Sequence, residues 1–201
     1  MEAHDLRLAM ERVSGRDLNW FFNQWYFGSG HPYVRITQNY DAAKKQVMVK
    51  LQQTQVQDKI FTLPIGIDVY VQGKRNHYDV WSKNKVDSFY FDAAVAPDNV
   101  NVDNDKVLLW SKDESKPLAQ FAYQMNHARN FLDRLEAVQE ASENEGNSIA
   151  AGILKKGLQD SFYVIRAAAM TTYNPKTLDS AKEAAIFANG MVLITRLLRI
   201  L

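Results

Sequence analysis

The chain has 201 residues, of which 46% are hydrophobic and 23% are charged, and its formal net charge is +1. This length can hold one large or two small domains, and the balanced charge gives no indication of a nucleic-acid partner or an anionic membrane surface. The chain contains no cysteine, which excludes disulfides, thiolate metal sites and a thiol nucleophile. Its first residues show no signal pattern, and no apolar run suggests a membrane span.

Two helices are predicted at the start of the chain. Residues 4–13 carry apolar side chains at helical spacing, and a Ser-Gly pair ends this first helix. A second helix is expected to begin at Asp17 and to end before Gly28. Its apolar stripe consists of Leu18, Phe21, Phe22 and Trp25. Two short helices cannot bury so many aromatic rings by themselves, so the face with Phe22 and Trp25 is expected to pack against the segment that follows.

Residues 33–112 change to a period of two, which predicts strands. The clearest run extends from Phe61 to Val71, and a bend or a bulge is expected at Pro64 within it. Further strands are expected around residues 47–51, 77–81, 86–91, 99–102 and 107–110, with turns at 41–44 and 73–74. About seven short strands at this spacing, separated by turn signals, predict a β-sandwich.

From Ser115 onward the apolar spacing becomes helical again. One long helix is expected from Leu118 to about Glu140, followed by helices over 149–158, 160–172 and 180–201. In the helix over 160–172, Asp160 precedes Ile165-Arg166 and three alanines. This pattern resembles a HEAT-type helical repeat, in which the aspartate caps the helix and the arginine reaches neighbouring polar groups. An unrelated capped helix is an equally good interpretation.

Catalytic chemistry has no visible centre in this sequence. Zinc hydrolysis needs two imidazoles on one helix face and a third ligand. The four histidines, His4, His31, His77 and His127, are too far apart for that spacing, and each is expected to be structural or exposed to solvent. The nucleophile elbow, the phosphate-binding loop and the dinucleotide fingerprint are also missing. No catalytic, cofactor-binding or metal-binding residue is therefore predicted.

One acidic stretch could hold calcium, because carboxylate and amide oxygens suit a hard cation. Its members are Asp98, Asn99, Asn101, Asp103, Asn104 and Asp105. The stretch lacks the loop glycine and the terminal glutamate of an EF-hand, so a polar strand followed by a turn is the preferred interpretation. The abundant aromatic residues could likewise form a ligand-stacking patch, but packing in the core is their commoner use.

The residues around the second predicted helix carry more information than their periodicity. From Met10 they read Met-Glu-x-Val-Ser-Gly-x-Asp-Leu-x-x-Phe-Phe-x-Gln-Trp and continue to Gly-x-Gly-x-Pro and a strand. This string resembles the end of the catalytic domain in zinc aminopeptidases of the gluzincin type, the alanyl aminopeptidase (aminopeptidase N) family. Three further pieces resemble sandwich strands and C-terminal HEAT-like helices of that family, in the family's order. They are Gln52-Gln-Thr-Gln55, Phe61-Thr-Leu-Pro64-Ile and the segment from Leu158 to Arg166.

The resemblance implies an α+β fold in three parts. Residues 1–31 would be the last helices of a catalytic domain, residues 32–114 a β-sandwich, and residues 115–201 the start of an all-α HEAT-like domain. The parent protein would be a zinc-dependent metallopeptidase, a hydrolase that removes N-terminal residues from peptides. Its His-Glu-x-x-His motif would lie upstream of Met1, so neither zinc nor another cofactor is expected in this fragment.

The implied role is non-catalytic. The chain would brace the upstream catalytic domain, its partner in the same polypeptide, and would shape the chamber that holds peptide substrates. The alternative belongs to another class: a non-catalytic β-sandwich and HEAT-like module that binds protein partners.

Overall fold

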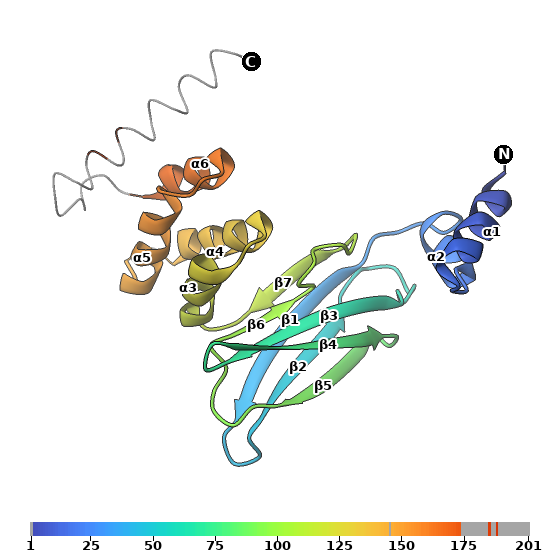
Figure 1. Ribbon diagram of the computed structural model, residues 1–201, viewed down its shortest axis with the longest axis horizontal. Coiled ribbons are helices and arrows are strands. Elements are labelled where there is room, and N and C mark those ends of the chain that lie inside the picture. Colours follow the sequence, from blue (N-terminus) through green and yellow to red (C-terminus); the bar gives the residue numbers. More distant parts are fainter. Residues whose placement is uncertain (1, 145, 174–184, 186–187, 189–201) are drawn as a thin grey trace.

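The computed structural model describes residues 2–144, 146–173, 185 and 188. In these residues a helical pair comes first, two β-sheets with seven strands in total follow, and four helices come last (Figure 1). This order confirms the predicted succession of helices, sheets and helices. The helix expected over residues 180–201 lies outside the described residues, apart from two isolated positions.

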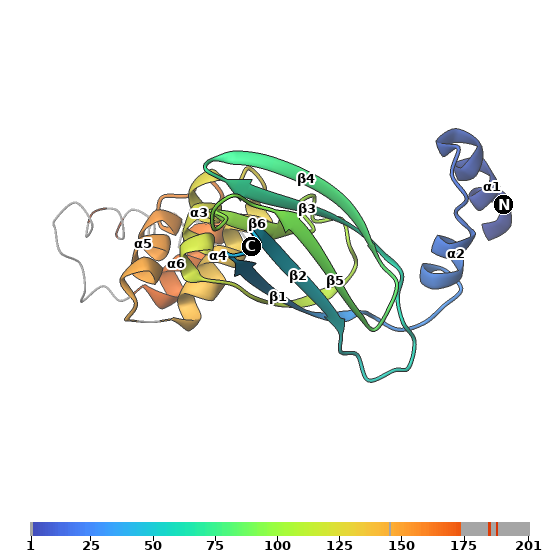
Figure 2. The ribbon, with the colours of Figure 1, turned by 90° about the horizontal axis from the view of Figure 1, so that it is seen from below.

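The helical pair consists of α1 (Ala3–Ser14) and α2 (Asn19–Trp25), and it lies at one end of the β-sheets (Figures 1 and 2). Phe22 is only 3% exposed. The ring of Trp25 lies 5.4 Å from the ring of Phe61, a core residue of the sheets. The face with Phe22 and Trp25 therefore packs where the sequence predicts.

The two sheets contain four and three strands. The first has the strand order β5-β2-β1-β7 and the second β4-β3-β6. The strands are β1 (Tyr33–Asp41), β2 (Gln46–Gln53), β3 (Leu63–Val71), β4 (Lys74–Ser82), β5 (Val86–Asp92), β6 (Asn99–Val102) and β7 (Ser111–Ser115). All neighbours are antiparallel except β1 and β7, which are parallel. We refer to residues 33–115 as the β unit.

The two sheets face each other around one hydrophobic core. Alternation along the strands directs every second side chain inward, so Ile36, Val49 and Ile67 are fully buried. The β3–β4 ladder continues through Pro64 without a bulge, so the interruption expected at this proline is absent. Pro64 lies where β3 pairs with β4 alone, and its missing N–H therefore leaves no second ladder incomplete.

The prediction of a strand over residues 107–110 was wrong. Val107 and Leu109 are exposed while Leu108 and Trp110 contact the core, so the segment shows the alternation of a strand. It has no ladder partner, however, and the last strand is β7, which pairs with β1. The alternating pattern indicates that one side of an extended segment is buried. A β-strand also requires a neighbouring strand with which its backbone forms hydrogen bonds.

The prediction of a single long helix from Leu118 to Glu140 was also wrong. The structure has two helices there, α3 (Leu118–His127) and α4 (Phe131–Glu143). Ala128 adopts an extended conformation, and the Asn130 side chain accepts a hydrogen bond from Leu132 N at 3.0 Å. Asn130 therefore caps a new helix, and this cap outweighs the continuous apolar spacing.

The last two described helices occur close to where they are predicted, as α5 (Ser148–Gly157) and α6 (Tyr163–Thr172). A Cβ at Gly157 would lie 2.9 Å from the Cβ of Ala169 on α6, so the two helices approach each other closely there. Asp160 accepts a hydrogen bond from Phe162 N, and Arg166 donates to the Asp160 carbonyl oxygen at 2.6 Å. The aspartate thus lies before the helix start, and the arginine reaches polar groups of the preceding loop.

Candidate functional site

The first candidate site is an exposed apolar surface on the helical pair. None of the residues in α1 is buried. The large apolar side chains that are exposed on α1, α2 and the residues after α2 are Leu6, Leu8, Met10, Val13, Phe21, Tyr26 and Phe27. We call this set the hairpin surface. Exposed large apolar side chains gathered on two short helices are a feature of interaction sites.

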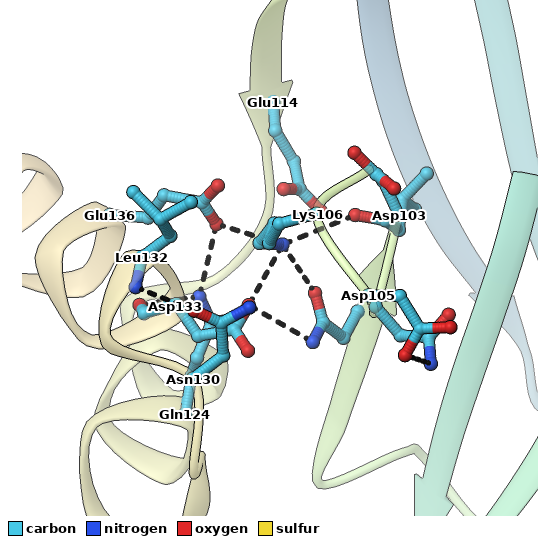
Figure 3. Close-up of polar contacts among 12 residues, drawn as sticks. Asp103, Asp105, Lys106, Glu114, Gln124, Asn130, Leu132, Asp133 and Glu136 are labelled. Atoms are coloured by element: carbon cyan, nitrogen blue, oxygen red, sulfur yellow. Dashed lines mark hydrogen bonds and ion pairs between the residues drawn. The ribbon is translucent and has the colours of Figure 1, made fainter. Parts of the chain in front are cut away.

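The second candidate site lies where the β unit meets α3 and α4. Lys106, in the loop after β6, places its Nζ 2.8 Å from Asp133 Oδ1 and 3.4 Å from Glu136 Oε2, both on α4 (Figure 3). It also donates to Asn101 Oδ1 on β6 at 3.0 Å. The side chains of Lys106 and Asp133 are only 6% and 5% exposed, so this ion pair is buried.

Strand β7 and the residue that follows it add three alternating charged residues to the same site. Lys112 Nζ lies 2.9 Å from Glu114 Oε2 and 3.0 Å from Glu136 Oε1, and Lys116 Nζ lies 3.6 Å from Glu114 Oε1. In the pairing with β1, Lys112 and Glu114 stand opposite Val34 and Ile36, which face the core. These charges therefore point inward from an edge strand, an arrangement that discourages pairing with another chain. We call Lys106, Lys112, Glu114, Lys116, Asp133 and Glu136 the junction network.

At Glu114 and Lys112, neighbouring opposite charges outweigh the effect of burial on the pKa. Burial by itself raises the pKa of Glu114, but the ammonium groups of Lys116 and Lys112 lower it to about 2. Burial lowers the pKa of Lys112, and Glu114 and Glu136 overcome this and raise it above its ordinary value. Burial dominates at Lys116 and lowers its pKa, although Glu114 opposes this shift.

The network joins four elements into one rigid contact. Lys116 donates to Gln124 Oε1 on α3 at 2.7 Å, and Gln124 donates to the Asp133 carbonyl oxygen on α4 at 2.8 Å. Asn101 on β6 donates to Asp133 Oδ1 at 3.1 Å. The charges are satisfied by one another, so the arrangement can fix the orientation of the helices on the β unit.

The four histidines lie in separate parts of the molecule. His4 contacts Arg7 on α1, His31 contacts Ser111, His77 contacts Asp68, and His127 contacts the Tyr123 carbonyl oxygen. Within the part of the chain that the structure describes, no three histidine, aspartate or glutamate residues are placed to hold a metal ion. The described residues therefore do not form a zinc site, and no zinc-dependent step is assigned to them.

In the acidic stretch considered for calcium, the aspartates before and after β6 accept hydrogen bonds from backbone N–H groups. Asp98 accepts a hydrogen bond from Gly73 N at 2.7 Å, before the strand. Asp103 accepts from Val107 N at 3.1 Å, after the strand. These contacts agree with the interpretation as a polar strand and turn.

His77 gives a prediction that tests the local electrostatics. Its Nδ1 lies 2.7 Å from Asp68 Oδ1, and this hydrogen bond raises the pKa of His77 above 6.5. The stabilisation is therefore present below the unfolded pKa and is lost as the pH rises through the folded pKa. We expect an NMR titration of the His77 ring to give a pKa above 6.5 that falls in Asp68→Asn. A wild-type pKa at or below 6.5 would contradict this assignment.

The amino-acid sequence alone does not reveal the junction network. Its members are spread over residues 106–136 and none belongs to a catalytic or metal-binding motif. The available signal is the alternation Lys112-x-Glu114-x-Lys116, which places opposite charges on one face of a strand. Such a face is ordinarily exposed to solvent, so the pattern alone does not predict burial.

The fold is aminopeptidase-like. Legionella pneumophila aminopeptidase A, solved in complex with aspartic acid, has a similar structure with a TM-score of 0.64 and 16% sequence identity. The similarity covers 96% of this chain and 24% of that structure. In sequence, transcription initiation factor TFIID subunit 2 of Saccharomyces cerevisiae is 43% identical over 49 residues, which are 24% of this chain and 3% of that protein. No family model matches the chain.

Among the described residues, no helix combines the length and the apolar character needed to cross a bilayer.

Proposed function

We propose that this chain is a non-catalytic part of an aminopeptidase-like metallopeptidase. The observation that carries the proposal is the likeness to aminopeptidase A over 96% of the chain. The proposed division is the same as the one that the sequence predicts: catalytic-domain helices over 1–31, a β-sandwich over 32–114 and a HEAT-like region from 115. Zinc would belong to the catalytic domain of the parent protein.

In this proposal the hairpin surface packs against the catalytic domain. Burial of its side chains would contribute about 1.5–3 kcal/mol for each large apolar group. The helical pair is firmly held by the β unit, because the Gln24 side chain bonds both Thr62 N (2.7 Å) and Thr62 O (3.0 Å). A domain seated on the hairpin surface would therefore be braced by the β unit.

The helical region would form part of the wall of the substrate chamber. The junction network supports this role, because buried ion pairs join α4 to the β unit and Lys116 donates a hydrogen bond to Gln124 on α3. Peptide substrates would then meet a wall of fixed shape. The chain's own residues supply position and shape here, and the catalytic domain supplies the chemistry.

The second candidate function is a module that binds protein partners. The 49-residue match to a subunit of a transcription initiation factor favours it, because that protein's name describes a component of an assembly. The hairpin surface would in that case be the site where a separate partner protein binds.

The proposal is tested on two polypeptides from one gene, the 201-residue chain and the full translated product. We expect the full product to release alanine from alanyl-p-nitroanilide and to contain zinc, and the chain alone to do neither. A full product without turnover or zinc would overturn the first function and favour the second.

A matched pair of variants tests the hairpin surface in the full product. Tyr26→Ser should lower the free energy of unfolding by about 1.5–3 kcal/mol, because it removes a ring that is buried against the catalytic domain. Tyr90→Ser is the control, since Tyr90 is equally exposed on β5, away from the helical pair. Equal effects of the two substitutions in urea unfolding would contradict the bracing role.

A further inference from the structure

A lysine, an amide and a carboxylate meet in a buried position between β7 and α3. The side chain of Lys116, the residue after β7, is fully buried. Its Nζ lies 3.2 Å from Asn99 Oδ1 on β6 and 3.6 Å from Glu114 Oε1. Asn99 is 2% exposed, and the ring of Phe121 lies 4.6 Å from the same Nζ. We call Lys116, Asn99 and Glu114 the buried triad.

The lysine of the buried triad has the surroundings of a nucleophile. Burial lowers the pKa of Lys116, although Glu114 opposes this shift. A lysine attacks a carbonyl carbon only as the neutral amine, and removal from water favours that form. Glu114 Oε1 is close enough to Nζ to take up its proton after a small movement.

The amide of Asn99 is the one that can be displaced. Lys116 also donates to Gln124 Oε1 at 2.7 Å, but the Gln124 amide nitrogen is held by the Asp133 carbonyl oxygen and by Glu136 Oε2. The amide nitrogen of Asn99 donates to no described residue, and it is not enclosed as a buried atom without a partner. Asn99 lines a polar groove of about 510 Å³ between β6 and the break between α3 and α4. Its nitrogen can therefore leave into solvent.

A second lysine lies equally close to an asparagine but is less suited to react. Lys106 Nζ is 3.0 Å from Asn101 Oδ1, and it also pairs with Asp133 at 2.8 Å and with Glu136 at 3.4 Å. Two carboxylates favour the ammonium form, which cannot attack. The Asn101 amide nitrogen is also tied, because it donates to Asp133 Oδ1 at 3.1 Å. Lys116 faces one carboxylate within ion-pairing distance, and that carboxylate is Glu114.

We propose that Lys116 and Asn99 form an isopeptide bond within this chain, with Glu114 carrying the protons. The Lys116 ammonium group gives one proton to Glu114, and the amine attacks the Cγ of Asn99. The Nζ–Cγ bond forms and the Cγ–Nδ2 bond breaks. Nζ gives up a second proton, and the two protons pass through Glu114 to Nδ2, which leaves as ammonium. The reaction needs no oxidant and no further reactant.

The bond would join the two sheets covalently. Asn99 begins β6 in one sheet, and Lys116 follows β7 of the other sheet, directly before α3. Lys112, whose Nζ lies 2.9 Å from Glu114 Oε2, would remain as the cation beside Glu114. The inference goes beyond the proposed function and does not rest on it.

The experiment is mass spectrometry of the folded chain after prolonged incubation at neutral pH. We expect an intact mass lower by one ammonia than the sequence mass. Trypsin should then release residues 86–106 and 113–129 as one branched peptide, because Asn99 lies in the first and Lys116 in the second. Fragmentation of that peptide should place the link between these two residues. A succinimide at an asparagine loses the same mass but leaves the two peptides separate.

Three variants separate the roles of the residues. Lys116→Met should have the full sequence mass, whereas Lys106→Met, the matched control, should still lose one ammonia. Glu114→Gln should form the link about 100-fold more slowly or worse, because it removes the proton carrier. Circular dichroism verifies the fold of each variant, and the peptide map of the wild-type chain decides the question even if a variant does not fold.

Two results would overturn the proposal. One is a wild-type chain with the full sequence mass and with residues 86–106 and 113–129 recovered as separate peptides. The other is a link between Lys106 and Asn101 or between Lys116 and Gln124, which would show that the buried triad is not the reacting group.

Discussion

Lys106→Met should lower the free energy of unfolding by about 3–5 kcal/mol, because it leaves a buried carboxylate without its cation. The methionine keeps the apolar stem, so the change removes the ammonium group alone. Asp133 is 3% exposed and would retain only the hydrogen bond from Asn101 on its side chain. Urea unfolding followed by circular dichroism measures the difference.

Arg35→Met is the matched control for this substitution. Arg35 pairs with Asp113 at 3.0 Å across the β1–β7 ladder, but the two side chains are 59% and 71% exposed. Exposed pairs contribute about 0–1 kcal/mol, so this variant should be close to wild type. If the two variants lose similar amounts of stability, the junction network does not hold the helices on the β unit.

Acid should weaken the same junction through Glu114. A folded pKa of about 2 against the usual 4.5 corresponds to roughly 3 kcal/mol of stability at neutral pH. The folded pKa is lowered, so this contribution is present above the unfolded pKa and is lost as the pH falls from about 4.5 to about 2. Urea unfolding at a series of pH values should show stability falling steeply in this window.

Glu114→Gln isolates that contribution from the other carboxylates. The variant should be less stable than wild type at pH 7, and the difference should shrink as the pH falls below about 4.5. Glu143→Gln, at an exposed position on α4, should leave the pH dependence unchanged. A difference between Glu114→Gln and wild type that is constant from pH 7 to pH 2 would contradict the lowered pKa.

The largest elements of this fold could be predicted because local spacing and burial coincide in them. The alternation from Phe61 to Val71 predicts β3, and the helical spacing of Phe22 and Trp25 predicts the buried face of α2. In both segments, the spacing of the apolar side chains along the sequence matches the face that is buried in the structure. The polar groups of the candidate sites give no such signal, because a charged residue at a given spacing is compatible with solvent or with a buried partner.

The sequence by itself determined the order of helices and strands, the buried face of α2 and the absence of thiol chemistry. Only the tertiary structure decided that Ser111–Ser115, and not residues 107–110, pairs with β1, because a ladder depends on a distant strand. It also decided that Asn130 divides α3 from α4, which opens the groove. The inward charges of β7 became partners of α4 for the same reason: ion pairing depends on distances in space, and sequence separation does not determine these distances.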